Sequence, residues 1–506
     1  MKSLRWRRLL VLGTVCLAVA GMALATYTHV APSAKAAPAD ATESEGTSDP
    51  VVGYYTFITS STTPPSEAQC FSAGRRCFTP QSARASYNVQ PLYNAGYDGT
   101  GVTIAIVDSY GSDTIAHDLH VYDTAFGLQP MCGEEGVTCA PGMPTFSQLH
   151  VQGSPPTSPY PGKGPGQEDK SGWALEVSLD VETAHAMAPG ANILLVTTPT
   201  AETLGVQGLP QMMDAEQYVV DHHLASVISQ SFGTTEQAFA STQSLLNLRH
   251  AYIAAAASGV TVLASSGDGG TANGVKPPVG KGGGSVPYPT VNWPASDPLV
   301  TGVGGTYLCT NPVTGVGVDS TDPPSRCIAN PGQREVGWIA SGGGFSSIFA
   351  RPSYQNTLPA GSTAIGAMRG VPDVAFEASA LTGGLVYVSL PPDGQGGLSC
   401  GSAPCSAGWY DIGGTSLACP QFAALVAIAD QINGGGLGQI NPALYAIGAN
   451  PARYAADFFD VTTGNNQTDP TIPGYPATTG WDPITGLGTP NAANLIPDLV
   501  AAAHGG

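Results

Sequence analysis

Positively charged residues are scarce in this chain of 506 residues. Lysine and arginine together number 18, against 37 aspartates and glutamates, and charged residues make up only 11% of the sequence. This acidic balance argues against binding to nucleic acid, because phosphates attract basic surfaces. A chain with few basic groups also gains little positive self-repulsion when its carboxylates are protonated. The composition therefore suits an acid-tolerant protein, and it suits a neutral secreted hydrolase as well.

Long hydrophobic runs are absent beyond the N-terminus, so we expect no membrane span in the mature chain. The exception is the run from Leu9 to Ala25, which follows a short basic stretch. The sequence Ala34-Lys35-Ala36 then offers a cleavage site. We predict a signal peptide over residues 1–36 and a secreted, extracellular protein; an uncleaved signal anchor is the alternative.

Cysteines are few, and their spacing matches no zinc pattern. Most of the ten fall into close pairs, with no histidine nearby to complete a zinc site. Pairs that local are typical of disulfides formed in an oxidising compartment. We interpret the unpaired Cys419 as a small buried core residue. The expected pairs are Cys70–Cys77, Cys132–Cys139, Cys309–Cys327 and Cys400–Cys405.

The Gly-x-Ser-x-Gly elbow of lipase-type hydrolases is also missing. The chain instead carries the run Gly413-Gly414-Thr415-Ser416 before a stretch of small and apolar residues. Glycines let a backbone approach a substrate closely, and we expect Pro420 at the start of a helix that continues over 422–432. Ser416 would then lie at a helix N-terminus, where the dipole favours a developing oxyanion. A plain glycine-rich turn is the alternative.

Glu176 and Asp180 lie in a predicted helix that begins near Gly172 and ends before Pro189-Gly190. Their spacing of four residues puts both carboxyls on one face, about 6 Å apart along the axis. Because the segment contains no lysine or arginine, two ionised carboxylates would repel each other, which raises one pKa and favours a shared proton. We interpret the pair as acid-base groups; a solvated acidic helix face is the alternative.

Asp268 lies in the run Ser265–Gly270, directly after the predicted strand Val260–Ala264. The position resembles the one where subtilisins carry the asparagine of their oxyanion site, and an aspartate donates a hydrogen bond to an oxyanion only when it is protonated. A catalytic site built on this residue would therefore work in acid. By itself, the run would be interpreted as a turn.

Taken in this order, the three segments resemble the sedolisin family of serine-carboxyl peptidases, the acid-adapted branch of the subtilase superfamily. The likeness runs from about Ala85 to Val500 and includes the runs 292–296, 341–346 and 369–374. The resemblance implies an α/β, subtilisin-like fold with a central, mostly parallel sheet flanked by helices. It also implies a serine-type peptidase with polypeptide substrates.

The resemblance assigns each candidate residue a role. Ser416 is the nucleophile that forms an acyl-enzyme, Glu176 the general base, Asp180 the carboxylate linked to it, and Asp268 the oxyanion donor. One alternative is a neutral subtilisin-like peptidase that uses Asp108, although no His-Gly-Thr-His helix accompanies it. Another is a catalytically silent secreted binding protein on the same fold.

One structural calcium ion near the C-terminus is also implied by the resemblance. Its expected ligands are the carboxylates of Asp460 and Asp482 and the carbonyls of Val461, Thr478 and Gly480. Calcium takes six to eight hard oxygens of these kinds. The alternative is that both aspartates belong to ordinary turns.

We expect strands over 102–107, 193–197, 225–229 and 260–264 to alternate with helices, as in a parallel sheet covered on both faces. Residues 37–84 are polar and predict a short pro or linker segment, which is too short for the large pro-domain that the resemblance implies. Residues 85–506 predict one sedolisin-like peptidase domain, which we expect to act as a monomer. The natural substrate, its side-chain preference, and endopeptidase against tripeptidyl cleavage stay open.

Overall fold

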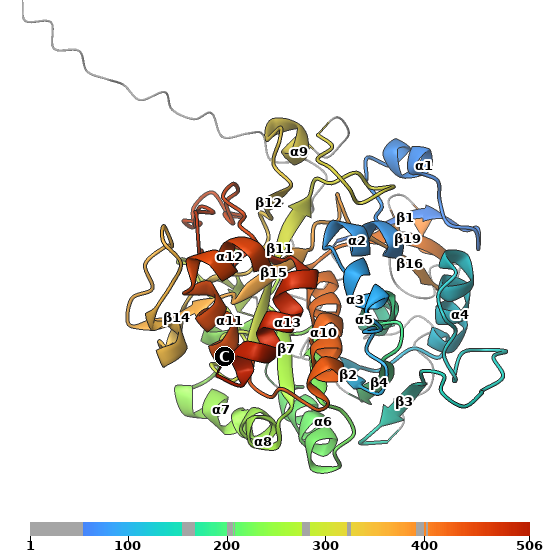
Figure 1. The fold of residues 1–506 in the computed structure, drawn as a ribbon, viewed down its shortest axis with the longest axis horizontal. Coiled ribbons are helices and arrows are strands. Elements are labelled where there is room, and N and C mark those ends of the chain that lie inside the picture. Colours follow the sequence, from blue (N-terminus) through green and yellow to red (C-terminus); the bar gives the residue numbers. More distant parts are fainter. Residues whose placement is uncertain are drawn as a thin grey trace, which may run out of the picture. The chain divides into compact units, whose positions relative to one another are not determined.

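Figure 1 shows a computed structural model of the chain, which describes residues 54–153, 167–199, 206, 208–275, 284–320, 325–390, 399–400 and 403–505. The expected signal peptide over residues 1–36 and the part of the expected linker before Tyr54 lie outside the described residues. Within the described residues, no helix has the length and hydrophobicity that a membrane crossing requires.

The centre of the domain is an eight-stranded sheet in the order β12-β11-β7-β5-β2-β4-β3, with β15 also paired to β11. Every neighbouring pair is parallel except β11 and β12, which are antiparallel. This confirms the expected α/β fold with a mostly parallel central sheet. The strands are β2 (Thr103–Ser109), β3 (Phe146–His150), β4 (Asn192–Thr198), β5 (Val227–Gln230), β7 (Thr261–Ser265), β11 (Thr301–Leu308), β12 (Glu335–Gly337) and β15 (Val374–Glu377).

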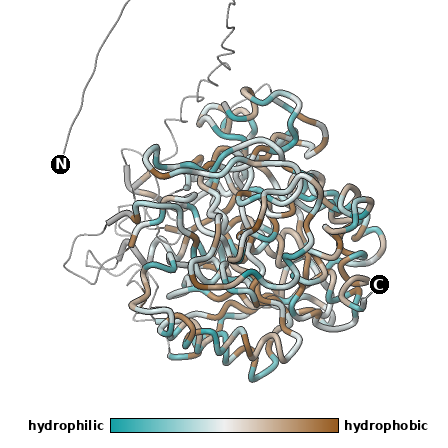
Figure 2. Tube along the Cα trace, turned by 90° about the vertical axis from the view of Figure 1, so that its left-hand side faces the viewer, coloured by the Kyte–Doolittle hydropathy of each residue, from teal (hydrophilic) through white to brown (hydrophobic). Residues whose placement is uncertain are grey.

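Helices cover both faces of the sheet because alternate strand residues face opposite sides. In β2, Ile104 and Ile106 join the core beneath α5 (Gln167–Met187), α10 (Thr415–Asn433) and α13 (Ala492–Ala503). Ala105 and Val107 join the core beneath α6 (Leu209–Asp221) and α8 (His250–Ser258). Figure 2 shows brown, hydrophobic stretches recurring along the described part of the chain.

Pro420 does not start a helix, so that expectation is wrong. Helix α10 begins at Thr415, and Pro420 lies inside it. Proline has no N–H to donate to the carbonyl four residues earlier, so the Ser416 carbonyl loses its usual partner within the helix. The dense burial of the following residues, from Phe422 to Ala429, stabilises the helix despite this loss.

A second, three-stranded antiparallel sheet contains part of the expected linker. It has the order β1-β19-β16, with β1 (Tyr55–Thr59), β16 (Gly384–Val388) and β19 (Gly408–Ile412). Strand β1 pairs with β19 so that Tyr55 lies opposite Ile412. The described residues before Ala85 thus pack into the fold, while their expected role as a pro or linker segment stays a prediction.

All four expected disulfides are present, and Cys419 is free and buried. The remaining helices are α1 (Glu67–Ser72), α2 (Pro80–Ser86), α3 (Gln90–Asn94), α4 (Ile115–Phe126), α7 (Thr242–Leu246), α9 (Ser325–Ala329), α11 (Asn441–Gly448) and α12 (Pro451–Asp457). The remaining strands are β6 (Thr234–Thr235), β8 (Gly274–Val275), β9 (Gly284–Ser285), β10 (Asn292–Trp293), β13 (Gly344–Ala350), β14 (Met368–Val371), β17 (Ser399–Cys400), β18 (Ala403–Pro404), β20 (Phe458–Phe459) and β21 (Thr489–Pro490).

Candidate active site

The turn between β19 and α10 presents Ser416. Gly414 has a φ of 123°, a backbone conformation that side chains with a Cβ rarely adopt. A Cβ at Gly413 would collide with the main chain of Ala380, so this position also requires glycine. Ser416 is the second residue of α10 and is fully buried. Its place in the first turn of a helix favours negative charge beside it.

Asp268, just beyond the end of β7, is joined to the start of α10. Its Oδ1 accepts hydrogen bonds from the main-chain N–H and the hydroxyl of Thr415, both at 2.8 Å. The N–H of Gly267 in turn donates to Thr415 Oγ1 at 2.9 Å. Because Oδ1 already accepts two hydrogen bonds, the proton of a neutral Asp268 belongs on Oδ2. The structure thus brings Asp268 and the residue before Ser416 into direct contact.

Glu176 and Asp180 lie one turn apart on α5, as expected, and both are buried, with exposed fractions of 2% and 0%. Burial raises the pKa of Asp180 well above its usual range, and the carboxyls of Asp108 and Glu176 raise it further, while the nearby Ser231 hydroxyl lowers it. The neutral form of Asp180 is therefore favoured. The alternative of a solvated acidic helix face is wrong, because the packing of α5 against the domain removes both carboxyls from water.

Cys419 shows where these carboxyls lie relative to the nucleophile. Burial raises the pKa of its thiol to about 12, and the Asp180 and Glu176 carboxyls both contribute to that rise. Cys419 is one turn after Ser416 on α10, so both carboxyls of α5 lie close to this part of α10. A thiol with this pKa stays protonated, which confirms the interpretation of Cys419 as a core residue.

Asp108, near the end of β2, joins this cluster of buried carboxyls, in the structural or site-edge role that its place at a strand end suggested. It is fully buried, and burial raises its pKa to about 8. Its carboxyl interacts electrostatically with Asp180, and among the described residues no ion pair joins it to a histidine. Its position at the carboxyl end of a central parallel strand was the available signal, because functional residues of α/β sheets gather at that edge.

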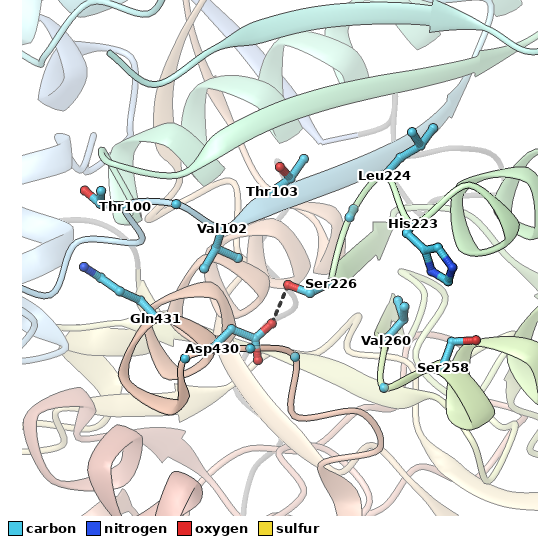
Figure 3. A pocket seen from close by; sticks show the side chains of 16 residues that line it. Thr100, Val102, Thr103, His223, Leu224, Ser226, Ser258, Val260, Asp430 and Gln431 are labelled. Atoms are coloured by element: carbon cyan, nitrogen blue, oxygen red, sulfur yellow. Dashed lines mark hydrogen bonds between the residues drawn. The ribbon is translucent and has the colours of Figure 1, made fainter. Parts of the chain in front are cut away.

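A separate pocket of about 520 Å³ lies at the amino ends of the central strands, opposite the carboxyl ends where Asp108 and Asp268 lie. Figure 3 shows its lining at the amino ends of β2, β5 and β7, where the hydroxyl of Ser226 donates to Asp430 at 2.6 Å. Asp108 lies at the carboxyl end of β2, and Asp268 follows the carboxyl end of β7. The pocket is therefore not part of the candidate active site.

The two aspartates of the candidate calcium site lie near one hydroxyl. Asp460 Oδ1 accepts hydrogen bonds from Tyr454 Oη at 3.0 Å and the Gly480 N–H at 3.1 Å. Burial is the main cause of the raised pKa of the Tyr454 hydroxyl, and Asp460 and Asp482 raise it further. Both carboxyls therefore lie close to that hydroxyl.

Asp482 is buried, and its carboxyl accepts hydrogen bonds from the main-chain N–H groups of Thr478, Ile484 and Thr485. Burial raises its pKa to about 7. Among the described residues, neither Asp460 nor Asp482 forms an ion pair, and no three His, Cys, Asp or Glu side chains are grouped as metal ligands. Two carboxyls that have no cationic partner among the described residues could serve as calcium ligands. Main-chain carbonyls of the adjoining loop would have to complete the set of oxygen ligands.

Comparison with known proteins agrees with this fold. The profile described as "Subtilase family" matches residues 166–478. Kumamolisin of Bacillus sp. strain MN-32 is 32% identical over 448 residues, which cover 86% of this chain and 66% of kumamolisin. Sedolisin of Pseudomonas sp. strain 101 is 33% identical, with 65% of this chain and 49% of sedolisin covered. Human tripeptidyl-peptidase 1 is 30% identical, with 66% and 53% covered.

These alignments leave a third or more of each relative unmatched. Among solved structures, Pseudomonas sedolisin, described as a serine-carboxyl proteinase complexed with two molecules of pseudo-iodotyrostatin, superposes with a TM-score of 0.58 at 26% identity. The superposition covers 84% of this chain and 98% of that one. The family profile matches more than half of this chain, so the chain belongs to the subtilase family. Its likeness to kumamolisin and to the sedolisin structure places it in the sedolisin branch.

Proposed function

We propose that the protein is a secreted, acid-acting serine-carboxyl endopeptidase that hydrolyses peptide bonds through an acyl-enzyme on Ser416. The observation that carries this proposal is the pair of hydrogen bonds from Thr415 to Asp268 Oδ1. They hold a carboxyl beside the nucleophile turn, with the other carboxyl oxygen able to carry a proton. Polypeptides are the proposed substrates of a monomeric enzyme, with no role for nucleic acid or a membrane.

In the first half of the reaction, Ser416 Oγ attacks the carbonyl carbon of the scissile peptide bond. Glu176 accepts the serine proton as the new C–O bond forms. The carbonyl oxygen gains negative charge and accepts a hydrogen bond from protonated Asp268 Oδ2. The C–N bond then breaks, and Glu176 returns the proton to the leaving amine.

In the second half, water attacks the acyl-enzyme and gives its proton to Glu176. The same oxyanion donor is used, and collapse releases the carboxylic acid while Ser416 regains its proton. The neighbouring Asp180, whose neutral form is favoured by burial, can donate a hydrogen bond to ionised Glu176. The chemistry thus needs two protonated carboxyls around one base, which is the reason that we propose activity in acid.

We further propose one structural calcium ion bound by the carboxylates of Asp460 and Asp482 and the carbonyls of Val461, Thr478 and Gly480. Support comes from two carboxyls that share one neighbourhood without an ion pair among the described residues. When bound, the ion would supply positive charge that stabilises both ionised carboxylates. These residues would hold the C-terminal loop and take no part in the chemistry.

The two alternatives have less support. A neutral subtilisin-like mechanism on Asp108 needs a histidine partner, whereas the Asp108 carboxyl interacts with Asp180. A silent binding protein would have no need for a cluster of buried carboxyls near α10 together with a serine that follows a glycine turn. Neither alternative explains why Asp268 is bonded to Thr415.

Mass spectrometry of the products of an unfolded protein substrate in acid tests the proposed function. We expect new internal termini that depend on Ser416. If the products are instead successive three-residue fragments from the substrate N-terminus, the protein is a tripeptidyl-peptidase and not an endopeptidase. Fragments that still form in a folded Ser416→Ala protein would overturn the nucleophile and the mechanism.

A further inference from the structure

We propose that Tyr54 is a positioning residue for Asp268, so that the segment expected as a linker is a working part of the active enzyme. This inference rests on the proposed function. It begins with three contacts that join separate parts of the chain: the N-terminal segment before β1, the loop after β7, and the turn before α10.

The three contacts form a closed circuit of hydrogen bonds. The hydroxyl of Tyr54 donates to the main-chain carbonyl of Asp268 at 3.1 Å. The main-chain carbonyl of Tyr54 accepts the N–H of Gly413 at 2.9 Å. Asp268 Oδ1 accepts two bonds from Thr415, two residues after Gly413. Tyr54 therefore binds the main chain of the proposed oxyanion donor with its side chain and the nucleophile turn with its backbone.

The circuit supports Asp268, the proposed oxyanion donor, through both its side chain and its main chain. The Thr415 bonds hold only the side chain of Asp268, which hangs from a glycine-rich loop between Gly267 and Gly269. The Tyr54 hydroxyl holds the main chain of the same residue. Catalytic groups need placement to within about 0.5 Å, so support from both sides affects how well Oδ2 meets the developing charge.

Tyr54 is itself held firmly. Its side chain is 5% exposed, and its ring packs edge-on against Trp338 with 5.1 Å between ring centres. Directly after it, β1 pairs with β19, the strand that ends at the nucleophile turn. The packing of the ring and the pairing of the adjacent strand fix the direction of the Tyr54 hydroxyl. Its hydrogen bond to Asp268 therefore links the three-stranded sheet to the candidate active site.

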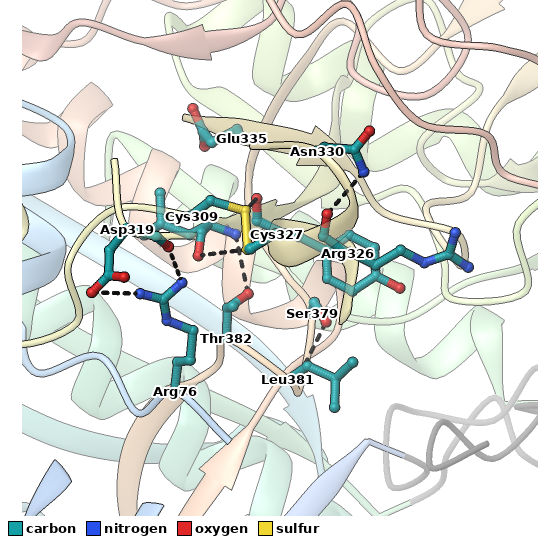
Figure 4. Close-up of a disulfide and its surroundings, with 12 residues drawn as sticks. Arg76, Cys309, Asp319, Arg326, Cys327, Asn330, Glu335, Ser379, Leu381 and Thr382 are labelled. Carbon is teal, nitrogen blue, oxygen red and sulfur yellow. Dashed lines mark hydrogen bonds and ion pairs between the residues drawn. A yellow bond between two sulfur atoms is a disulfide. The ribbon is translucent and has the colours of Figure 1, made fainter. Parts of the chain in front are cut away.

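The far end of the same segment is anchored in the domain. Arg76 is fully buried, and its guanidinium binds Asp319, with 3.3 Å between Nη2 and Oδ2. Asp319 lies in the loop closed by the Cys309–Cys327 disulfide, and Figure 4 shows Arg76 reaching into it. Losing one partner of a buried ion pair is strongly unfavourable. Release of this segment on activation is therefore disfavoured.

Tyr54→Phe tests the inference, because it removes the hydroxyl and keeps the ring against Trp338. We expect kcat to fall about three- to tenfold, as for loss of one hydrogen bond, with KM and the melting temperature almost unchanged. The matched control is Tyr55→Phe, the same chemical change at the adjacent residue, whose hydroxyl lies 4.0 Å from Cys405 Sγ. The control should keep wild-type kcat.

A double-mutant cycle separates positioning from general destabilisation. If Tyr54 acts through Asp268, then Tyr54→Phe should have little further effect on kcat in an Asp268→Ala background. An equal fall in kcat in both backgrounds would overturn the inference. So would an active enzyme that has lost residues 54–59, shown by intact mass, and retains full kcat.

The wild type decides which proposal fails. A wild-type protein without hydrolysis that depends on Ser416 would remove the proposed function, and with it this inference. An active wild type whose Tyr54→Phe variant keeps full kcat would overturn the role of Tyr54 alone. We expect the active wild type to retain Tyr54 and the variant to lose kcat.

Discussion

Asp268 and Thr415 are joined by two hydrogen bonds of 2.8 Å to a single carboxyl oxygen. Thr415 is the first residue of α10, and Asp268 follows β7, so the contact links the end of a central strand to the start of the helix that carries Ser416. These two bonds fix the position of Oδ1 and, because the carboxyl group is planar and rigid, restrict where Oδ2 can lie. This geometry underlies the predictions on the oxyanion donor and the nucleophile.

Ser416→Ala should lower peptide hydrolysis by about a thousandfold or more, because no acyl-enzyme can form. The side chain is small and the change leaves the glycine turn intact, so the melting temperature should stay close to that of the wild type. Ser258→Ala, at the exposed end of α8, is the control and should retain full activity. Substantial hydrolysis by a folded Ser416→Ala protein would contradict the assignment.

Asp268→Ala should lower kcat by about a hundred- to thousandfold, the usual effect of removing one oxyanion donor. Asp268→Asn should lose less, because an amide keeps the oxygen that accepts from Thr415 and adds an N–H donor at any pH. Its activity should also persist to higher pH than that of the wild type. Measuring kcat against pH for both variants checks this, and equal loss in both would argue against a donor role.

Thermal stability should fall as pH rises from about 4 to about 8. Burial raises the pKa of Asp108 to about 8 and of Glu377 to about 8, and raises that of Asp180 as well. The folded protein therefore binds more protons than the unfolded chain in this window, and rising pH favours unfolding. We expect a fall in melting temperature of about 5 °C or more.

Asp108→Asn should make this pH dependence shallower, since it removes one buried carboxyl without changing the shape of the side chain. Asp221→Asn, on the exposed end of α6, should leave the slope unchanged. A melting temperature that rises between pH 4 and pH 8 would show that these carboxyls have favourable partners when ionised.

Chelation of calcium should lower the melting temperature near neutral pH, because an ion bound only by the folded state stabilises it by mass action. Burial raises the pKa of Asp482 to about 7, so protons should compete with the ion and calcium affinity should fall as pH drops below that value. Asp482→Asn should abolish the effect of the chelator, and Asp221→Asn should not. No stoichiometric calcium by metal analysis would show that both aspartates are turn residues.

Much of the fold could be predicted because its signals are local. Helix α5 ends before Pro189-Gly190 as expected, since proline and glycine end helices for steric and conformational reasons. The disulfide pairs follow from close spacing along the chain. The one-turn spacing of Glu176 and Asp180 follows from helix geometry alone.

Other features depend on contacts between distant segments. The pairing of β1 with β19 joins residues more than 300 positions apart. The polar composition of residues 37–84 gives no sign of this pairing. The electrostatic interaction between Asp108 and Asp180 depends on how β2 lies beneath α5. Pro420 looked like a helix start because its own N–H is missing, whereas the glycine turn ahead of Thr415 decides where α10 begins.

The rate of hydrolysis of an unfolded protein substrate, measured from pH 2 to pH 9 with Ser416→Ala as the blank, tests the proposed acid peptidase most directly. The reaction requires a proton on Asp268, and free carboxyl groups titrate near pH 4. We predict an optimum between about pH 3 and pH 5, with activity lost toward neutral pH. An optimum between about pH 7 and pH 9 would contradict the serine-carboxyl mechanism.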